Sequence, residues 1–279
     1  ATNTNTVQRF FQRGVQVGND AEVNTANESY VLWQWLLGDS ATTGSSITTG
    51  SPSLTTTGIV ADADHFSIIS YTGSGSNATV AHGLSAAPEM YIVRDRTDGN
   101  DWNVYHENAN ASPASGSLRL DSTAAFNADA TLWNGVPTAS LINLGSSAET
   151  NALNKAFIAY CFRSIPGVCK VGSYEGNGAT DGVYISLGFR PRWFIVKNVD
   201  TAGQDWRIYD TAIEPINVND QFFKANANAA QISSSGFDFL ADAVKARDSN
   251  AGFNSSATFV YMAMADLGGN GTLPPIYGR

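Results

Sequence analysis

The feature that most constrains the fold of this chain is an internal repetition with a spacing of about 103 residues. Short motifs rich in aromatic residues and glycine recur in the same order along two successive stretches. The matched motifs are SYTGSG (70–75) with SYEGNG (173–178), PEMYIV (88–93) with PRWFIV (191–196), and DWNVY (101–105) with DWRIY (205–209). Self-similarity at a fixed spacing indicates that one structural unit occurs more than once. The sequence therefore predicts two related units, residues 63–166 and 167–268.

Each predicted unit ends in an Ala-x-x-Asn motif followed by an aromatic-rich stretch, FIAYCF (157–162) in the first unit and FVYMAM (259–264) in the second. A third copy of this ending lies near the N-terminus, where residues 17–24 lead into YVLWQW (30–35). Residues 1–38 therefore match the C-terminal half of a preceding unit. Two explanations of the missing first half stay open: a longer parent chain was trimmed, or another chain completes the unit.

Alternation of apolar and polar residues with a period of two dominates each unit, which predicts short β-strands. The expected strands are 66–71, 79–82, 90–95, 103–106, 117–120, 141–144 and 156–162 in the first unit, and 170–174, 183–187, 193–199, 207–209, 236–240 and 258–265 in the second. Gly-rich turns separate these strands. The pattern favours an all-β fold of tandem antiparallel β-sandwich-like repeats of about 103 residues.

The remaining segments carry weaker signals. No segment has a sustained helical period, although residues 123–130 could form one or two helical turns. Gly73-Ser74-Gly75 follows a strand and precedes no helix, so a hairpin turn is expected rather than a phosphate-binding loop. Residues 39–62 are rich in Ser, Thr and Gly, which is typical of a linker or a loosely paired strand. Residues 269–279 are expected to form a C-terminal tail.

Several aromatic and proline positions mark the repeat and are candidate core residues. They are Tyr71, Pro88, Trp102, Tyr160, Tyr174, Pro191, Trp193, Trp206 and Tyr261. Trp102 and Trp206 occupy one repeat position, whereas Trp193 corresponds to Met90. A position that exchanges tryptophan for methionine is typical of a core, which favours packing over the alternative role of a sugar-stacking platform. Trp33 and Trp35 share one face of the strand expected at 30–35, where the next unit has Tyr160 and Phe162, and this also favours packing.

The charge balance disfavours two classes of partner. Sixteen Lys and Arg residues stand against 25 Asp and Glu residues, which leaves a net charge of -9. A nucleic-acid partner requires a basic surface that displaces phosphate counterions, and the sequence contains no basic run. Binding to an anionic membrane is disfavoured for the same reason, and no apolar stretch approaches the roughly 18 to 20 residues that cross a bilayer. We therefore expect neither nucleic acid nor a membrane as a partner.

The reactive side chains form no catalytic pattern. His65, His82 and His106 are scattered, and none of them recurs in the second unit. Cys161 and Cys169 lie eight positions apart and could form a disulfide, but two separately buried thiols are the favoured alternative because free cysteine behaves as a small apolar residue. We expect no catalytic residues and no cofactor, and the sequence assigns no ligand-binding residues.

Two loops carry clustered side-chain oxygens, DRTDGND (95–101) and NVDTAGQD (198–205). A calcium site requires about six to eight oxygen ligands, several of them carboxylates. The second loop keeps only Asp200 and Asp205, so a turn between strands is the favoured interpretation and no metal site is expected. In these turns Gly99 and Gly203 are expected to adopt positive φ angles.

The repeated blocks resemble a known family. They are SYTGSGSNATVAHGLSAAPEMYIV (70–93), FIAYCFRS (157–164), GSYEGNGATDGVYISLGFRPRWFIVK (172–197) and FVYMAMAD (259–266). They are similar to a repeated β-domain of unknown function from large virion proteins of tailed bacteriophages, and the resemblance covers about residues 15–266. It implies a tail-fibre-like or other structural protein, with no catalytic residues to carry over. The chain departs from the usual pattern where GFRP (188–191) replaces the longer GLSAAP (83–88).

These observations predict a non-enzymatic structural or assembly protein, located in a phage virion or outside the cell, for example in an extracellular filament. Repeated sandwiches would supply a stiff building block, and the open half-unit could accept a strand from a neighbour. Expected partners are copies of the chain in a trimer or filament, other virion proteins and a host surface glycan. The first alternative is a carbohydrate- or receptor-binding module for host attachment, and the second is a glycan depolymerase.

Overall fold

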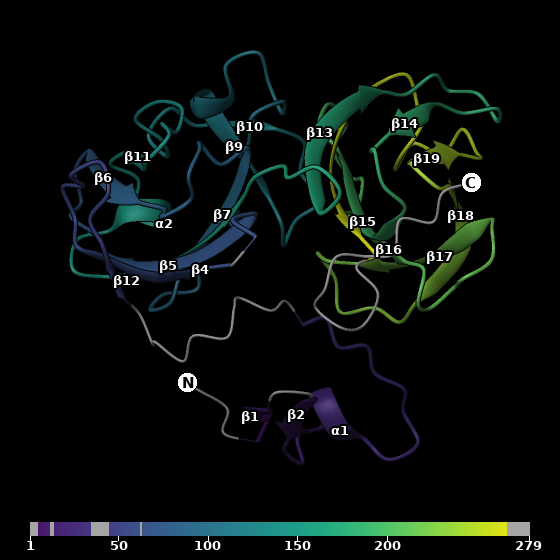
Figure 1. Ribbon diagram of the computed structural model, residues 1–279, viewed down its shortest axis with the longest axis horizontal. Coiled ribbons are helices and arrows are strands. Elements are labelled where there is room, and N and C mark those ends of the chain that lie inside the picture. The colour runs from purple at the N-terminus through teal and green to yellow at the C-terminus, as the bar shows by residue number, and fades with distance from the viewer. Residues whose placement is uncertain (1–4, 12–13, 35–44, 62, 267–279) are drawn as a thin grey trace. The chain divides into compact units, whose positions relative to one another are not determined.

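The computed structural model describes residues 5–11, 14–34, 45–61 and 63–266. Antiparallel β-strands dominate these residues, which confirms the predicted all-β class. The chain divides into two compact units, residues 1–36 and 37–279, which are described separately. The larger unit contains two eight-stranded sheets, coloured blue to teal and green to yellow in Figure 1. Trp35 and the predicted tail 269–279 lie outside the described residues.

The first sheet has the strand order β10-β9-β8-β7-β12-β5-β4-β3. Its strands are β3 (Ser45–Ile47), β4 (Thr56–Val60), β5 (Phe66–Thr72), β7 (Met90–Asp95), β8 (Asn103–His106), β9 (Gly116–Arg119), β10 (Asn127–Ala128) and β12 (Ala156–Phe162). A second layer consists of the pair β6 (Ala78–Ala81) and β11 (Leu141–Leu144), with the short helices η1 (Pro113–Ser115) and α2 (Ala148–Asn151) in the connections.

The core of the first sheet follows from the two-residue alternation of its strands. On β5 and β12, Ile69 and Phe157 point to the same face of the sheet, which is the face that carries the core. Val80 from β6 and Ile142 from β11 close over that face, so both layers contribute to one apolar cluster. Figure 1 shows β6, β11 and α2 on the concave side of the curved layer formed by β4, β5 and β12.

The second sheet has the strand order β13-β20-β15-β16-β17-β18-β19-β14. Its strands are β13 (Cys169–Glu175), β14 (Tyr184–Ser186), β15 (Pro191–Asn198), β16 (Arg207–Asp210), β17 (Asn219–Lys224), β18 (Ile232–Phe239), β19 (Ala243–Ala246) and β20 (Thr258–Ala265). Its core is rich in phenylalanine. The Phe237 ring lies 5.2 Å from the rings of both Phe194 and Tyr209, and 4.8 Å from that of Phe253. The pairs with Phe194 and Tyr209 are edge-to-face, a geometry that adds to the stabilisation that burial provides.

Five neighbouring strands of each eight-stranded sheet are arranged in the same order relative to the chain. The strand order β9-β8-β7-β12-β5 of the first sheet corresponds to β17-β16-β15-β20-β13 of the second. The pair β14 and β19 likewise takes the place of β6 and β11, and both pairs are antiparallel. In the second sheet, β18 connects this pair to the main sheet, whereas β6 and β11 form a separate sheet.

The smaller unit contains the strands β1 (Val7–Phe11) and β2 (Gly14–Val17), which pair antiparallel, and one turn of helix, α1 (Ala21–Asn24). Asp20 caps this helix by accepting a hydrogen bond from the amide of Glu22 at 2.8 Å. The strand predicted at residues 30–35 does not form over 30–34, where Tyr30, Val31 and Leu32 are exposed. A strand satisfies its backbone groups through neighbouring strands, and the described part of this segment has no such neighbours.

Two local predictions in the larger unit were wrong. Residues 123–130 contain no helix, because their backbone is engaged elsewhere: β10 pairs with β9, and the amide of Phe126 donates to the carbonyl of Val199 at 2.8 Å. The turn at residues 73–75 is not a hairpin, since β5 pairs with β4 and β12 whereas β6 pairs with β11. From the segment 39–62, residues 45–47 and 56–60 form β3 and β4 at the edge of the first sheet.

The two loop glycines singled out in the sequence differ in conformation. Gly203 has a φ of +84° and donates its amide hydrogen to the carbonyl of Thr123 at 2.9 Å, whereas Gly99 does not have a positive φ, so the prediction for Gly99 was wrong. A Cβ atom at either position would meet no heavy atom within 4 Å. Any difference between substitutions there must therefore come from the backbone.

We expect Gly203→Val to lower the free energy of unfolding by about 1–3 kcal/mol, because a β-branched residue is strained in the left-handed region. Gly99→Val should change it by less than about 0.5 kcal/mol, as surface substitutions without special features do. Urea denaturation of both variants measures the difference. Equal stability of the two variants would contradict the conformational argument.

Candidate functional site

On the outer face of the first sheet, opposite its core, the polarity of the side chains changes from one end of the strands to the other. The strand register arranges the outward side chains in rows across β5, β12, β7 and β8. Two rows are mainly apolar, Phe66 with Phe162, Met90 and His106, and Ile68 with Tyr160, Ile92 and Val104. The next row is more polar and contains Ser70, Ile158 and Arg94. The outer face therefore has an apolar end and a polar end.

The apolar end is buried although it belongs to neither of the two core clusters on the inner faces. The buried outward side chains are Phe66, Met90, Ile92, Val104, Leu118 and Phe162 in the first sheet, and Trp193, Ile195, Ile208, Val260 and Met262 in the second. Hydrogen bonds also join the two sheets. Gly203 bonds to Thr123, and Phe126 bonds to Val199. We conclude that the two sheets pack outer face against outer face, and we call this contact the inter-sheet interface.

Trp206 anchors one side of the inter-sheet interface. Its side chain is 1 % exposed, and its indole Nε1 donates a hydrogen bond to the carbonyl oxygen of Arg119, at the end of β9, at 2.8 Å. Trp102 occupies the same repeat position in the first sheet but is only half-buried. It stacks on Tyr160 at 6.2 Å between ring centroids, and the Arg94 guanidinium lies 5.3 Å from its centroid. The tryptophan of the recurring Asp-Trp motif therefore belongs to the interface in the second sheet and to a partly open surface in the first.

His106 lies on the other side of the inter-sheet interface and is 1 % exposed. Its Nδ1 accepts a hydrogen bond from the amide of Asn108 at 3.2 Å, so the ring proton is assigned to Nε2, which lies 3.5 Å from the carbonyl oxygen of Tyr261 in β20. Burial lowers the pKa of His106 from 6.5 to about 4, and the hydrogen bond to Tyr261 raises it only in part. The neutral imidazole is therefore the form that the interface accommodates.

This lowered pKa makes stability depend on pH. As pH falls from about 6.5 to about 4, the unfolded chain binds a proton at His106 that the folded chain excludes. The free energy of unfolding therefore decreases over this range, and the decrease levels off below about pH 4. The full effect is about 3 kcal/mol at 1.36 kcal/mol per pKa unit.

Denaturant unfolding at pH 7.5 and pH 4 should show that the native chain loses about this much more stability than His106→Gln, which cannot titrate. The variant serves as the reference because carboxylates and the other histidines also titrate in this window. Equal pH dependence of the two proteins would show that His106 is accessible to protons in the folded state.

The landmark tyrosines Tyr71 and Tyr174 lie near the ends of β5 and β13 and form equivalent corners. The Tyr71 hydroxyl donates to the carbonyl of Thr150 at 2.7 Å, and the Tyr174 hydroxyl donates to that of Phe253 at 2.6 Å. Each tyrosine also stacks on a phenylalanine of the neighbouring strand, at 5.3 Å in the first sheet and 5.1 Å in the second. Among the other landmarks, Pro88, Pro191, Trp193 and Tyr261 are buried, and Tyr160 is half-buried.

The titratable residues considered in the sequence do not come together. His82 is buried behind β6, where its Nδ1 accepts from the amide of Leu84, and His65 is half-buried at the start of β5. Burial lowers the pKa of both histidines. Cys161 and Cys169 are free and buried, on the inner face of the first sheet and the outer face of the second, and burial raises the pKa of each thiol to about 12.

The acidic loop at residues 95–101 forms a turn that satisfies its own backbone. Asp95 accepts hydrogen bonds from the amides of Thr97 at 2.7 Å and Asp98 at 3.1 Å, and Asn198 does the same in the second sheet for Asp200 and Thr201. Within the described ranges no group of three or more His, Cys, Asp or Glu side chains is placed to hold a metal ion.

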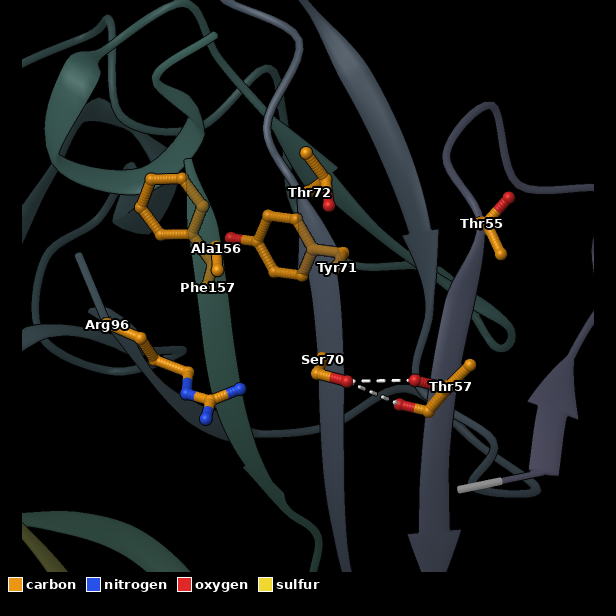
Figure 2. A pocket seen from close by; sticks show the side chains of 8 residues that line it. All are labelled: Thr55, Thr57, Ser70, Tyr71, Thr72, Arg96, Ala156 and Phe157. Atoms are coloured by element: carbon orange, nitrogen blue, oxygen red, sulfur yellow. Dashed lines mark hydrogen bonds between the residues drawn. The ribbon is translucent and has the colours of Figure 1, made fainter. Parts of the chain in front are cut away.

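The polar end of the first sheet's outer face carries a cavity of about 470 Å³ (Figure 2). It is lined by Thr55, Thr57, Ser70, Tyr71, Thr72, Arg96, Ala156 and Phe157. The rings of Tyr71 and Phe157 belong to the core, so the polar groups offered to the cavity are the hydroxyls and the Arg96 guanidinium. The sequence did not single out Arg96 or these hydroxyl residues, because a lone arginine among threonines forms no recognisable motif.

The described residues thus form an all-β protein whose two eight-stranded antiparallel sheets meet face to face, and a polar cavity lies on the exposed part of the first of these sheets. It belongs to the family described as a domain of unknown function (DUF7483), whose model matches residues 1–267. Comparison with curated proteins and with solved structures gave no match. In the part of the chain that the structure describes, none of the helices has the length and apolar character required to span a membrane.

Proposed function

We propose that this chain is a non-enzymatic structural protein that builds an assembly, in a phage virion or an extracellular filament. The observation that carries the proposal is the inter-sheet interface. Two sheets with separate apolar cores also bury the apolar ends of their outer faces, and interfaces of this kind resist local opening. A rigid block of stacked sheets suits a load-bearing or particle-forming role. The assignment to phage rests on the sequence resemblance alone.

We propose further that the two sheets are copies of one repeat unit of about 103 residues. The shared strand order supports this, as do the equivalent tyrosine corners, whose hydroxyls bond to carbonyls 79 positions along the chain in both sheets. Glycines with a positive φ angle recur at matching places as well, with φ of +72° at Gly75 and +63° at Gly178. Such units associate readily with further copies, because a surface that buries one copy is already shaped for a related one.

The expected partner in the assembly is a second copy of the chain. The outermost strands of the two eight-stranded sheets are β10 and β3 in the first and β13 and β14 in the second. Edge strands offer unpaired backbone groups to a neighbouring chain. This route of strand addition needs no change in either core.

Light scattering of the purified chain over a hundredfold range of concentration, with electron microscopy of the same samples, tests the proposal. The expected result is a discrete oligomer or a filament with a mass that is a multiple of 29.6 kDa. Incubation with bacterial polysaccharides should release no reducing ends. A strictly monomeric chain at every concentration, or digestion of a polysaccharide, would reject the structural assignment in favour of a binding module or a depolymerase, respectively.

A further inference from the structure

The cavity on the first sheet combines hydroxyl groups with one cationic side chain. Thr57 and Ser70 lie opposite each other on β4 and β5, and their hydroxyl oxygens are 2.8 Å apart. Thr55 and Thr72 are exposed at the rim. Figure 2 shows the Arg96 side chain extending over β12 toward the side on which Ser70 lies. The arrangement presents hydrogen-bond donors and acceptors for hydroxyl groups together with one positive charge.

The Arg96 guanidinium forms no hydrogen bond or ion pair with the described residues, although it acts electrostatically on Tyr160 and its backbone is anchored. Its amide donates to the carbonyl of Ala156 at 2.8 Å, which anchors the residue to β12. Among the described residues no carboxylate or carbonyl pairs with its side chain. The lining contains no acidic residue, so the cavity is a locally positive site on a chain whose net charge is -9. An anionic group is the ligand chemistry that a guanidinium binds best, through two parallel hydrogen bonds.

The second sheet lacks this combination at the equivalent place. Val199 stands where the first sheet has Arg96, and Glu175 stands where it has Thr72. Val199 is buried, and its carbonyl accepts the amide hydrogen of Phe126 within the inter-sheet interface. The cavity is therefore particular to the first sheet, and its arginine has no role in the repeated framework.

We propose that this cavity binds a carboxylate-bearing sugar residue, of the uronic acid class, in an oligosaccharide. The Arg96 guanidinium takes the carboxylate, and the hydroxyls of Thr57, Ser70 and Thr72 exchange hydrogen bonds with the ring hydroxyls. The volume of about 470 Å³ falls in the usual range of small-ligand sites, about 300–1,000 Å³. This inference adds a binding activity and does not depend on the structural role proposed above.

The neighbouring rows offer a surface along which a longer saccharide can continue. Arg94 lies in the row next to the cavity and is held by Asp121, with 3.8 Å between its Nη1 and the carboxylate oxygen Oδ2. Trp102 and Tyr160 stack on one another on the same outer face and are half-buried, so each keeps accessible ring surface. Aromatic rings present an apolar surface on which a sugar ring can pack.

Saturation-transfer difference NMR with trigalacturonate tests the proposal in solution, and it works for an assembled protein as well as for a monomer. The native chain should bind trigalacturonate saturably, with a dissociation constant on the order of 1 mM or below. The fully methyl-esterified trimer keeps the sugar rings but lacks the charge, and it should bind at least about tenfold more weakly, because a hydrogen bond between two charged groups is stronger than one to a neutral ester.

Three variants test whether trigalacturonate binds at this cavity. Arg96→Val installs the residue of the second sheet and should weaken trigalacturonate binding at least about tenfold, and Ser70→Val should weaken it by about threefold to tenfold. Arg190→Val removes another exposed arginine, outside the cavity lining, and should leave the affinity unchanged. Unfolding curves of each variant confirm that the fold is retained. The proposal is overturned by a lack of saturable binding, by unchanged affinity of Arg96→Val, or by equal binding of the esterified trimer.

Discussion

Trp206→Ala is expected to lower the free energy of unfolding by about 3–5 kcal/mol, the usual cost of removing a large buried aromatic side chain. The side chain is 1 % exposed and lies in the inter-sheet interface, so its loss leaves a cavity that neither sheet can fill alone. The carbonyl of Arg119 also loses its hydrogen bond from the indole nitrogen. Equilibrium unfolding in guanidinium chloride, followed by tryptophan fluorescence and by circular dichroism, measures the loss.

Two further variants separate the causes. Trp206→Phe keeps most of the apolar volume and should cost about 1–3 kcal/mol, because it removes the indole donor and part of the ring. Trp102→Ala removes the half-buried counterpart and should cost less than Trp206→Ala, by at least about 1 kcal/mol. If Trp206→Ala proves as mild as Trp102→Ala, the two sheets do not depend on each other in solution. The inter-sheet interface would then contribute little to the stability of the chain.

Asn254→Ala is expected to destabilise the chain by about 2–4 kcal/mol through a different mechanism. The amide of Asn254 is fully buried. Its Nδ2 lies 2.9 Å from the carbonyls of both Ala179 and Asp248, and its Oδ1 accepts from the amide of Asn177 at 3.2 Å. Truncation leaves these backbone groups without a partner, and each unsatisfied buried group costs about 1–3 kcal/mol. Urea denaturation of the variant measures the loss.

The asparagines of the other two Ala-x-x-Asn motifs supply matched controls. Asn151, at the end of α2, makes equivalent bonds to the carbonyls of Ser76 at 2.7 Å and Gly145 at 2.8 Å, so Asn151→Ala should cost about as much as Asn254→Ala. In the smaller unit, Asn24 bonds to the carbonyl of Gly18 at 2.8 Å but is exposed, and Asn24→Ala should cost less than about 1 kcal/mol. A large effect at Asn24 would mean that the bond itself, and not its burial, determines the cost.

Most strands could be located from the sequence because their pattern is local. β7 (Met90–Asp95), β8 (Asn103–His106), β11 (Leu141–Leu144), β12 (Ala156–Phe162) and β20 (Thr258–Ala265) coincide with the predicted ranges. The strands that were missed, such as β3, β4 and β19, are short or contain small residues, and they form because a neighbouring strand completes their hydrogen bonds. The helices α1 and α2 are single turns, which are too short for a helical period to be recognised in the sequence.

The candidate sites were less accessible to sequence reasoning. The tyrosine corners lie at repeated motifs, so the sequence pointed to Tyr71 and Tyr174, but their carbonyl partners, Thr150 and Phe253, are 79 positions away. Arg96 carried no signal, because an unpaired arginine is recognised only when its surroundings are known. Trp102 and Trp206 share one repeat position, and only their surroundings distinguish a half-buried ring from an interface anchor.

By itself, the sequence determined the all-β class, most of the strands and the family of motifs that recur along the chain, because alternation and turn chemistry act between residues close in sequence. Only the tertiary structure decided which strands are neighbours, which face of each sheet is covered and where a polar cavity stays open. Burial depends on what lies across a sheet face, and that partner comes from a distant part of the chain. His106 against Tyr261 and Trp206 against Arg119 are contacts of this kind, and no local pattern encodes them.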